Sequence, residues 1–197
     1  MSTVSSPWEY DSKSATDTDR LGQTLGRALH GGETIALYGD LGTGKTAFVR
    51  GIAAGLDAPR RAVTSPTFVF IHTYAGRLPM AHADLYRLES PAELRHLGLE
   101  EYFDDHMVVA VEWAEKAPND LPADRLEVHF LHVSTSRRRI QFRTTGPRSR
   151  RLLKRITATP VEPESSTLGR EQNKRAKRRM RAESTTSRDH RGTERRR

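Results

Sequence analysis

The sequence contains no cysteine among its 197 residues. This absence excludes a disulfide scaffold and a zinc site built on thiolates, and it fits a reducing compartment. Apolar residues make up only 35% of the chain, and no apolar run approaches the ~18 residues of a membrane-spanning helix. The first 13 residues are polar and lack the apolar stretch of a secretory signal. Together these absences predict a soluble, cytoplasmic protein.

The positive charge is confined to one end of the chain. Residues 170–197 contain 12 Lys or Arg against 4 Asp or Glu, whereas the first 169 residues contain 21 of each. A basic nucleic-acid-binding domain is therefore not indicated, because the body of the protein is neutral. Beyond Thr159 almost nothing is apolar enough to be buried, so residues 160–197 are predicted to form a disordered basic tail.

Hydrophobic periodicity predicts helices alternating with strands in residues 1–159, after a loose N-terminus over residues 1–14. The predicted helices cover residues 17–29, 45–56, 91–97 and 149–156. The predicted strands cover residues 33–38, 67–74, 78–85, 107–111, 125–133 and 138–144. This order indicates one α/β domain of the P-loop NTPase type, with a central mixed, partly parallel sheet flanked by helices.

The segment between the first predicted strand and the second predicted helix carries a phosphate-binding pattern. Gly39–Thr46 reads GDLGTGKT and fits G-x-x-x-x-G-K-[ST] at every fixed position. Glycines allow several backbone N–H groups to point at a phosphate, and the following helix adds its positive end. Lys45 supplies charge to the β- and γ-phosphates, and the Thr46 hydroxyl suits Mg²⁺. The predicted ATP-binding residues here are Gly39, Asp40, Leu41, Gly42, Thr43, Gly44, Lys45, Thr46 and Ala47.

Two carboxylates are candidates for the second magnesium contact and for positioning the attacking water. Glu112 ends the apolar run that begins at Met107, and ligands of open α/β sheets gather at the carboxyl ends of strands. Asp84 ends a shorter strand, but it could also cap a turn or pair with Arg87. His82 would share a strand face with Asp84. For this histidine a structural role is favoured, and a place in the site stays open.

The stretch Thr64–Thr67 (TSPT) follows the P-loop helix and contains three hydroxyl side chains. Ser65 and Thr67 are candidates for sensing the γ-phosphate or holding the metal through water. A Ser-Pro turn with no such role is the alternative.

Taken together, six ordered segments resemble the bacterial TsaE (YjeE) family of ATPases, over residues 15–145. They are GDLGTGKT (39–46), RGI (50–52), SPTF (65–68), HADLYRL (82–88), LGLEEYF (97–103) and VEW (111–113). That family serves the threonylcarbamoyl modification of the adenosine next to the tRNA anticodon. The resemblance implies a Mg²⁺-dependent ATPase that acts on a complex of TsaB and TsaD, where TsaD performs the transfer.

The resemblance also assigns residues. It implies that Lys45 and Thr46 bind phosphate and magnesium, that Glu112 is the metal-linked acid, and that Asp84 is a second acid of the site. Thr18, in the first helix, would lie near the adenine.

Two features depart from the family pattern. Ala47 stands where a second threonine is usual, which removes a hydroxyl near the α-phosphate and predicts an affinity loss of roughly 1 kcal/mol. The basic tail is an addition, and it would either bind tRNA phosphates or serve as a solvated extension.

Two other functions remain open from the residues. A small-molecule P-loop kinase would need an acceptor pocket and an arginine-rich lid. The candidate arginines show no such cluster; they are Arg50, Arg60, Arg61 and Arg87. A nucleotide-gated binding module with little turnover is the second alternative.

Overall fold

The structure is a computed structural model that describes residues 7–58 and 70–161. The described residues belong to one compact unit that ends at Val161. Apart from residues 160 and 161, the predicted tail (160–197) lies outside the described residues, so its disorder stays a prediction.

The described part of this unit contains seven strands and four α-helices, joined in places by short 3-10 turns. In chain order the elements are β1 (Trp8–Ser12), α1 (Ala15–Ala28), β2 (Thr34–Tyr38), α2 (Lys45–Gly55), β3 (Ile71–Tyr74), β4 (Met80–Asp84), α3 (Pro91–His96), η2 (Leu99–Tyr102), β5 (Val108–Glu112), η3 (Ala114–Lys116), β6 (Leu126–His132), β7 (Arg138–Thr144) and α4 (Pro147–Ala158).

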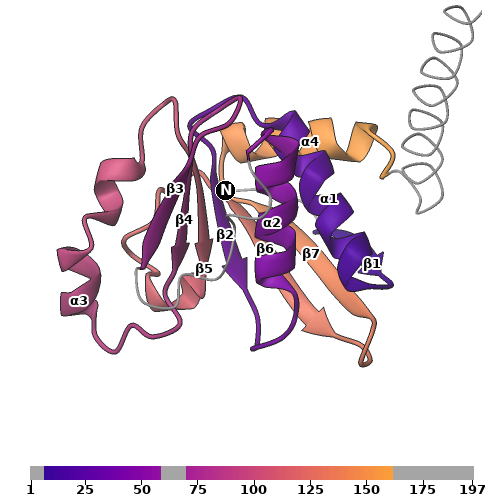
Figure 1. The fold of residues 1–197 in the computed structure, drawn as a ribbon, viewed down its shortest axis with the longest axis horizontal. Coiled ribbons are helices and arrows are strands. Elements are labelled where there is room, and N and C mark those ends of the chain that lie inside the picture. Colours follow the sequence, from indigo (N-terminus) through magenta and orange to yellow (C-terminus); the bar gives the residue numbers. More distant parts are fainter. Residues whose placement is uncertain (1–6, 59–69, 162–197) are drawn as a thin grey trace, which may run out of the picture. The chain divides into compact units, whose positions relative to one another are not determined.

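All seven strands form one sheet in the order β1-β7-β6-β2-β5-β4-β3 (Figure 1). The four inner strands β6, β2, β5 and β4 run parallel, while β7, β1 and β3 pair antiparallel at the two margins. The prediction of a mixed, partly parallel sheet flanked by helices is therefore confirmed, and β2 and β5 are parallel neighbours. Because parallel strands end at the same edge, the residues after β2 and at the end of β5 are brought together.

Helices cover the two faces of the sheet unequally. One face packs with α1, α2 and α4 around side chains such as Phe48, Phe130 and Phe142. On the other face, α3, η2 and η3 cover β2, β5 and β4 with a second apolar cluster. This division follows from strand alternation, since successive residues of the buried inner strands point to opposite faces.

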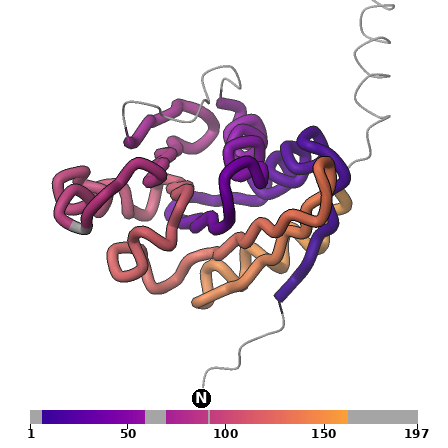
Figure 2. The backbone as a smooth tube through the Cα atoms, turned by 90° about the horizontal axis from the view of Figure 1, so that it is seen from below, coloured from indigo at the N-terminus to yellow at the C-terminus, as the bar shows by residue number. Residues whose placement is uncertain are grey.

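Helices α1 and α2 lie side by side, in indigo and purple (Figure 2). Their contact is lined by glycines: a Cβ atom added at Gly26 would lie 2.3 Å from the carbonyl oxygen of Ile52, and one at Gly51 would lie 2.0 Å from that of Asp19. The two backbones therefore approach each other more closely than any side chain would allow, which fixes the P-loop helix against α1.

The prediction of a loose N-terminus is wrong for residues 8–14. Trp8–Ser12 form β1, which pairs antiparallel with β7, and Ser14 caps α1 by accepting from the N–H of Asp17. The ring of Trp8 lies 5.0 Å from that of Phe142. The local composition does not predict this strand, because the strand is stabilised by pairing with β7, more than 120 residues away in the sequence.

The other predicted elements are present, and their ends coincide with the predicted ones or differ by up to four residues. The largest differences concern β3, whose predicted first residues 67–69 lie outside the described part of the chain, and α4, which extends two residues further at each end. Pro147 begins α4 because proline is tolerated in a first helical turn. Among the described residues, no helix is long and apolar enough to cross a membrane.

Candidate nucleotide-binding site

The P-loop leaves the carboxyl end of β2 and turns into α2. Gly39, Gly42 and Gly44 all have positive φ angles, of 129°, 78° and 105°. At Gly42 an added Cβ would meet no atom within 4 Å, so this glycine is required by the backbone conformation and not by crowding. The loop therefore forms an open cradle of the kind that presents N–H groups to a phosphate.

Lys45 begins α2 and is buried, with its ammonium group folded back onto the loop. Its Nζ donates to the carbonyl oxygens of Gly39 and Asp40, the latter at 2.9 Å. Burial lowers the pKa of Lys45 below its usual 10.5, and the carboxylates of Glu112, Glu115, Asp84 and Asp40 oppose that shift. A phosphate in the cradle would add further negative charge beside this ammonium group.

The hydroxyl of Thr46 reaches the strand next to the P-loop strand. Thr46 Oγ1 donates to Glu112 Oε2 at 3.0 Å, and Glu112 is the last residue of β5. The other oxygen of this carboxylate, Oε1, lies 2.9 Å from Nε2 of His82, which is fully buried on β4. A hydroxyl and a carboxylate are thus brought into contact from residues 66 positions apart. They are also the ligand types that Mg²⁺ takes in P-loop sites.

Asp84 lies on β4 directly beside Glu112, since the two are partners in the parallel register of β4 and β5. Its side chain is 8% exposed and its Oδ1 accepts from the N–H of Tyr86 at 3.0 Å. Neighbouring parallel strands are about 4.8 Å apart, so both carboxylates face the same edge of the sheet. Within the described ranges no three His, Cys, Asp or Glu side chains form a metal-binding group. Mg²⁺ fits two carboxylates and a hydroxyl when phosphate oxygens and water complete its shell.

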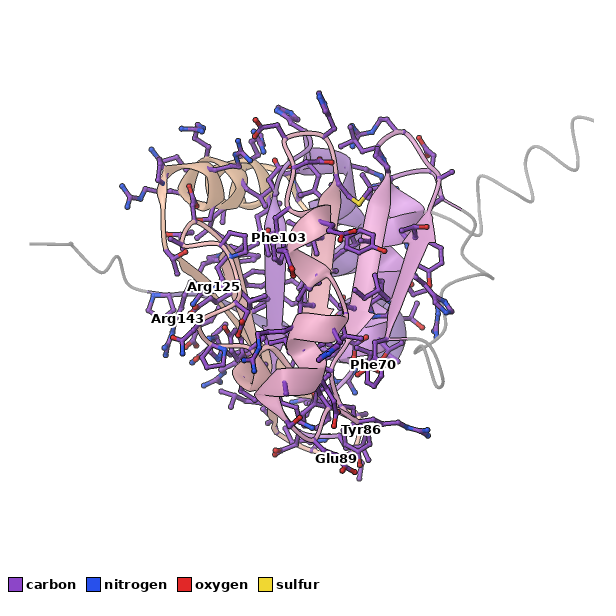
Figure 3. All side chains as sticks on the ribbon, turned by 90° about the vertical axis from the view of Figure 1, so that its left-hand side faces the viewer. Phe70, Tyr86, Glu89, Phe103, Arg125 and Arg143 are labelled. Atoms are coloured by element: carbon purple, nitrogen blue, oxygen red, sulfur yellow. The ribbon has the colours of Figure 1, made fainter. Side chains whose placement is uncertain are left out.

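Trp113 follows Glu112 with a left-handed backbone, φ 59°, which is uncommon for a bulky residue. Its ring lies 3.9 Å from Lys45 Nζ and 4.9 Å from the ring of Tyr86. Figure 3 shows Tyr86 at one edge of the sheet and Phe103 toward the opposite edge. The strained conformation turns the indole over the P-loop lysine, where it contributes a cation–π contact.

Arg138 is a residue of this region that the sequence analysis did not identify. It begins β7, is 6% exposed, and donates from Nη1 to Thr18 Oγ1 at 3.1 Å. A Cβ added at Gly44 would lie 3.5 Å from its Cδ and 3.7 Å from Cγ2 of Thr18. Its buried Nε has no hydrogen-bond partner among the described residues. No sequence motif marks this arginine; only the pairing of β7 in the sheet brings it to the P-loop.

The structure therefore brings most of the predicted residues together. Thr18 is buried beside the end of the loop, where Ser12 Oγ lies 2.7 Å from its hydroxyl, and its contact with adenine stays a prediction. Leu41 at the loop tip is 69% exposed. Ser65 and Thr67 lie outside the described residues, as do Arg60 and Arg61, so the structure does not place them.

Comparison with known proteins identifies similar sequences and a similar fold. The family described as "Threonylcarbamoyl adenosine biosynthesis protein TsaE" matches residues 12–140. The tRNA threonylcarbamoyladenosine biosynthesis protein TsaE of Bacillus subtilis is 41% identical over 127 residues, covering 64% of this chain and 78% of that protein. The protein of the same name from Treponema pallidum is 37% identical over 129 residues, covering 66% and 95%. The crystal structure of Bacillus subtilis YdiB superposes with a TM-score of 0.67 and 30% identity, covering 80% of this chain and 98% of that chain.

Proposed function

Because the chain belongs to the TsaE family of tRNA threonylcarbamoyladenosine biosynthesis proteins, we propose that it binds ATP with Mg²⁺ at Gly39–Thr46 and hydrolyses it in the cytoplasm. The observation that supports this most strongly is the contact between Thr46 Oγ1 and Glu112 Oε2 at 3.0 Å. It joins the first residues of the P-loop helix to the carboxyl end of the neighbouring strand, where the γ-phosphate of a bound nucleotide would lie.

Each side chain has a role that follows from its position. Lys45 exchanges the carbonyls of Gly39 and Asp40 for phosphate oxygens, because the phosphates supply a full counter-charge. Thr46 and Glu112 hold Mg²⁺, which neutralises charge on the phosphates when it is bound. Asp84, at the same edge, orients the attacking water. Catalysis of this kind depends on positioning and charge, so rigid placement of these groups is what the fold contributes.

His82 is proposed as a positioning residue for the site acid. Its Nε2 lies 2.9 Å from Glu112 Oε1, which leaves Oε2 for Thr46 and the metal. A fully buried imidazole cannot rotate freely, so it holds the carboxylate in one orientation.

Arg138 is proposed to contact the nucleotide from the side of α1. Its guanidinium lies beside Gly44 and Thr18, and its Nε, which has no hydrogen-bond partner within residues 7–58 and 70–161, is a donor for an anionic or polar acceptor. A hydrogen bond from Arg138 would partly compensate for the nucleotide affinity that is lost because Ala47 has no hydroxyl.

We further propose that TsaB and TsaD are the partners and that their complex activates turnover, as P-loop proteins are often slow until a partner completes the site. Phosphate release from ATP is measured for the full chain alone, then with TsaB, TsaD and tRNA. The test variant is Glu112→Gln, and the control is Glu100→Gln, which removes one exposed carboxylate elsewhere. We expect partner-stimulated release that falls by about 10²-fold or more in Glu112→Gln and is unchanged in Glu100→Gln.

Two outcomes would replace the proposal. Tight nucleotide binding with no phosphate release in any mixture would identify a nucleotide-gated binding module. Transfer of the phosphoryl group to a small molecule instead of water would identify a kinase.

A further inference from the structure

The outward face of α4 carries positive charge that the fold does not neutralise. The helix contains five cations and no carboxylate: Arg148, Arg150, Arg151, Lys154 and Arg155. Its inward residues Ser149, Leu152 and Ile156 are buried in the core, which leaves Arg150, Arg151 and Lys154 exposed. These three residues are called the α4 cationic face below.

Two of the five cations have structural partners. Arg148 Nη2 pairs with Asp105 Oδ1 at 2.8 Å, and Arg155 Nη2 pairs with the buried Glu33 Oε1 at 2.8 Å. In the part of the chain that the structure describes, the α4 cationic face forms no salt bridge. Its charge is therefore available to a partner.

This arrangement of charge is unfavourable for the helix itself. Arg150 lies one turn before Lys154, and Arg151 lies one turn before Arg155, so like charges face each other at i, i+4. Arginines also occupy the first turn, where the helix dipole favours acidic side chains. Neither helix formation nor burial in the core requires Arg150, Arg151 or Lys154, so their charge is available to an anionic surface.

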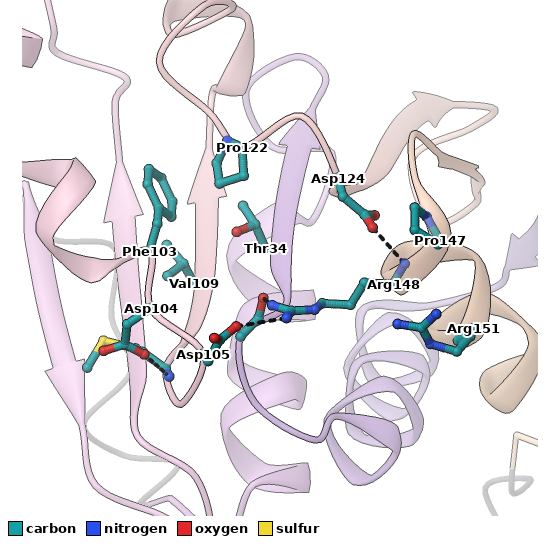
Figure 4. A pocket seen from close by; sticks show the side chains of 12 residues that line it. Thr34, Phe103, Asp104, Asp105, Val109, Pro122, Asp124, Pro147, Arg148 and Arg151 are labelled. Carbon is teal, nitrogen blue, oxygen red and sulfur yellow. Dashed lines mark hydrogen bonds and ion pairs between the residues drawn. The ribbon is translucent and has the colours of Figure 1, made fainter. Parts of the chain in front are cut away.

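The α4 cationic face is separate from the nucleotide site. The amino end of α4 borders a pocket of about 460 Å³ that includes Thr34, the first residue of β2, and Arg148 and Arg151 (Figure 4). The P-loop lies beyond the other end of β2, roughly 16 Å away at ~3.3 Å per residue. The carboxylates that line the pocket are Asp104, Asp105 and Asp124, and the last of these accepts from the N–H groups of Arg148 and Ser149. These acids lie at the amino end of the helix, whereas Lys154 is exposed almost two turns further along.

We propose that the α4 cationic face binds the phosphate backbone of RNA. Membership of a tRNA-modification family makes RNA the polyanion that this chain meets, and the inference does not depend on ATP hydrolysis. Lys and Arg side chains that neutralise phosphates release counterions, so such binding weakens steeply with salt. Contacts of this kind position an RNA without reading its sequence.

The test uses the full chain and a fluorescein-labelled tRNA transcript, with anisotropy measured from 50 to 200 mM salt. The test variant is Arg150→Gln/Arg151→Gln/Lys154→Gln. The control removes three other exposed cations, Lys13→Gln/Arg95→Gln/Arg143→Gln, so both variants have the same net charge and the same tail. Loss of three phosphate contacts predicts a log–log salt slope smaller by about 2–3 and an affinity lower by about tenfold or more at 100 mM salt. The control variant is expected to show a much smaller change in both the salt slope and the affinity.

Three results would overturn the proposal. Equal losses in the two variants would mean that only net charge matters, and no loss in the test variant would make the face a solvated surface. Equal loss of binding to phosphatidylserine vesicles or to polyglutamate would show a general polyanion site instead of an RNA site. The thermal midpoint of the test variant should be unchanged or higher, because like charges are removed, so lost binding cannot come from unfolding.

Discussion

The contact between α1 and α2 gives a prediction in which two physical effects have opposite signs. Gly26 lies inside α1, and replacing a helix-interior glycine with alanine normally stabilises a helix by about 1 kcal/mol. Here, however, the new Cβ would lie 2.3 Å from the carbonyl oxygen of Ile52 and 2.9 Å from Cα of Gly55. Both obstructing atoms belong to the backbone of α2, so no side-chain rotation can relieve the clash.

The packing term decides the sign. Overpacking a buried contact costs typically 1–3 kcal/mol, and a rigid backbone obstacle places Gly26→Ala at the upper end of that range. Subtracting the gain in helix propensity leaves a net loss of about 2 kcal/mol in the free energy of unfolding. For a domain of this size that corresponds to a decrease of roughly 4–8 °C in the thermal midpoint.

The measurement is thermal and urea unfolding of Gly26→Ala beside Thr16→Ala. Thr16 is exposed in the first turn of the same helix, so its alanine variant tests propensity without crowding and should change stability by less than about 0.5 kcal/mol. The reasoning would be refuted by a thermal midpoint of Gly26→Ala equal to or above that of the unmodified protein. Such a result would mean that the two helices separate at little cost.

Three further predictions concern other parts of the molecule. Asp124→Ala removes the acceptor of two N–H groups at the start of α4 and should lower the free energy of unfolding by about 1 kcal/mol in urea titrations, while Asp124→Asn should retain part of the cap. Burial, and secondarily Arg143, lowers the pKa of His129 in the folded protein below 6.5. The free energy of unfolding should therefore decrease as pH falls from 6.5 through this lower pKa. His129→Asn should reduce this dependence on pH in unfolding measured from pH 7.5 to 5. In a variant that keeps Trp113 as the single tryptophan, ATP should change the indole emission, because phosphates draw Lys45 Nζ away from the ring. An unchanged spectrum despite bound ATP would contradict the proposed role of Lys45.

Much of the candidate site could be predicted because the P-loop depends on residues that follow one another directly in the sequence. The P-loop needs a strand, a glycine-rich turn and a helix in immediate succession, and all three are readable within Thr34–Gly55. The position of Glu112 was also predictable, since a compact apolar run indicates a buried strand and parallel strands end at one edge. The role of His82 could not be assigned from the sequence, because it depends on a contact with Glu112 on the neighbouring strand.

The strand β1 escaped prediction for a related reason. Its first four residues alternate between partly buried and exposed positions, Ser12 is buried, and the strand contains no aliphatic side chain. Pairing with β7 and the contact of Trp8 with Phe142 stabilise it, and neither is visible in the local sequence. A strand at the margin of a sheet needs only one apolar face, so its hydrophobic signal is weak.

Arg138 is a site residue that a rule based on the carboxyl ends of parallel strands cannot predict. Searching the carboxyl ends of strands finds Glu112 and Asp84, because β5 and β4 both run toward the P-loop edge. An antiparallel strand runs the other way, so the residue that it places at that edge is its first one. Arg138 is the first residue of β7 and pairs with Ser12 at the end of β1, which explains how it meets Thr18 and Gly44. In a mixed sheet, the amino ends of the antiparallel strands therefore belong in the search for site residues together with the carboxyl ends of the parallel ones.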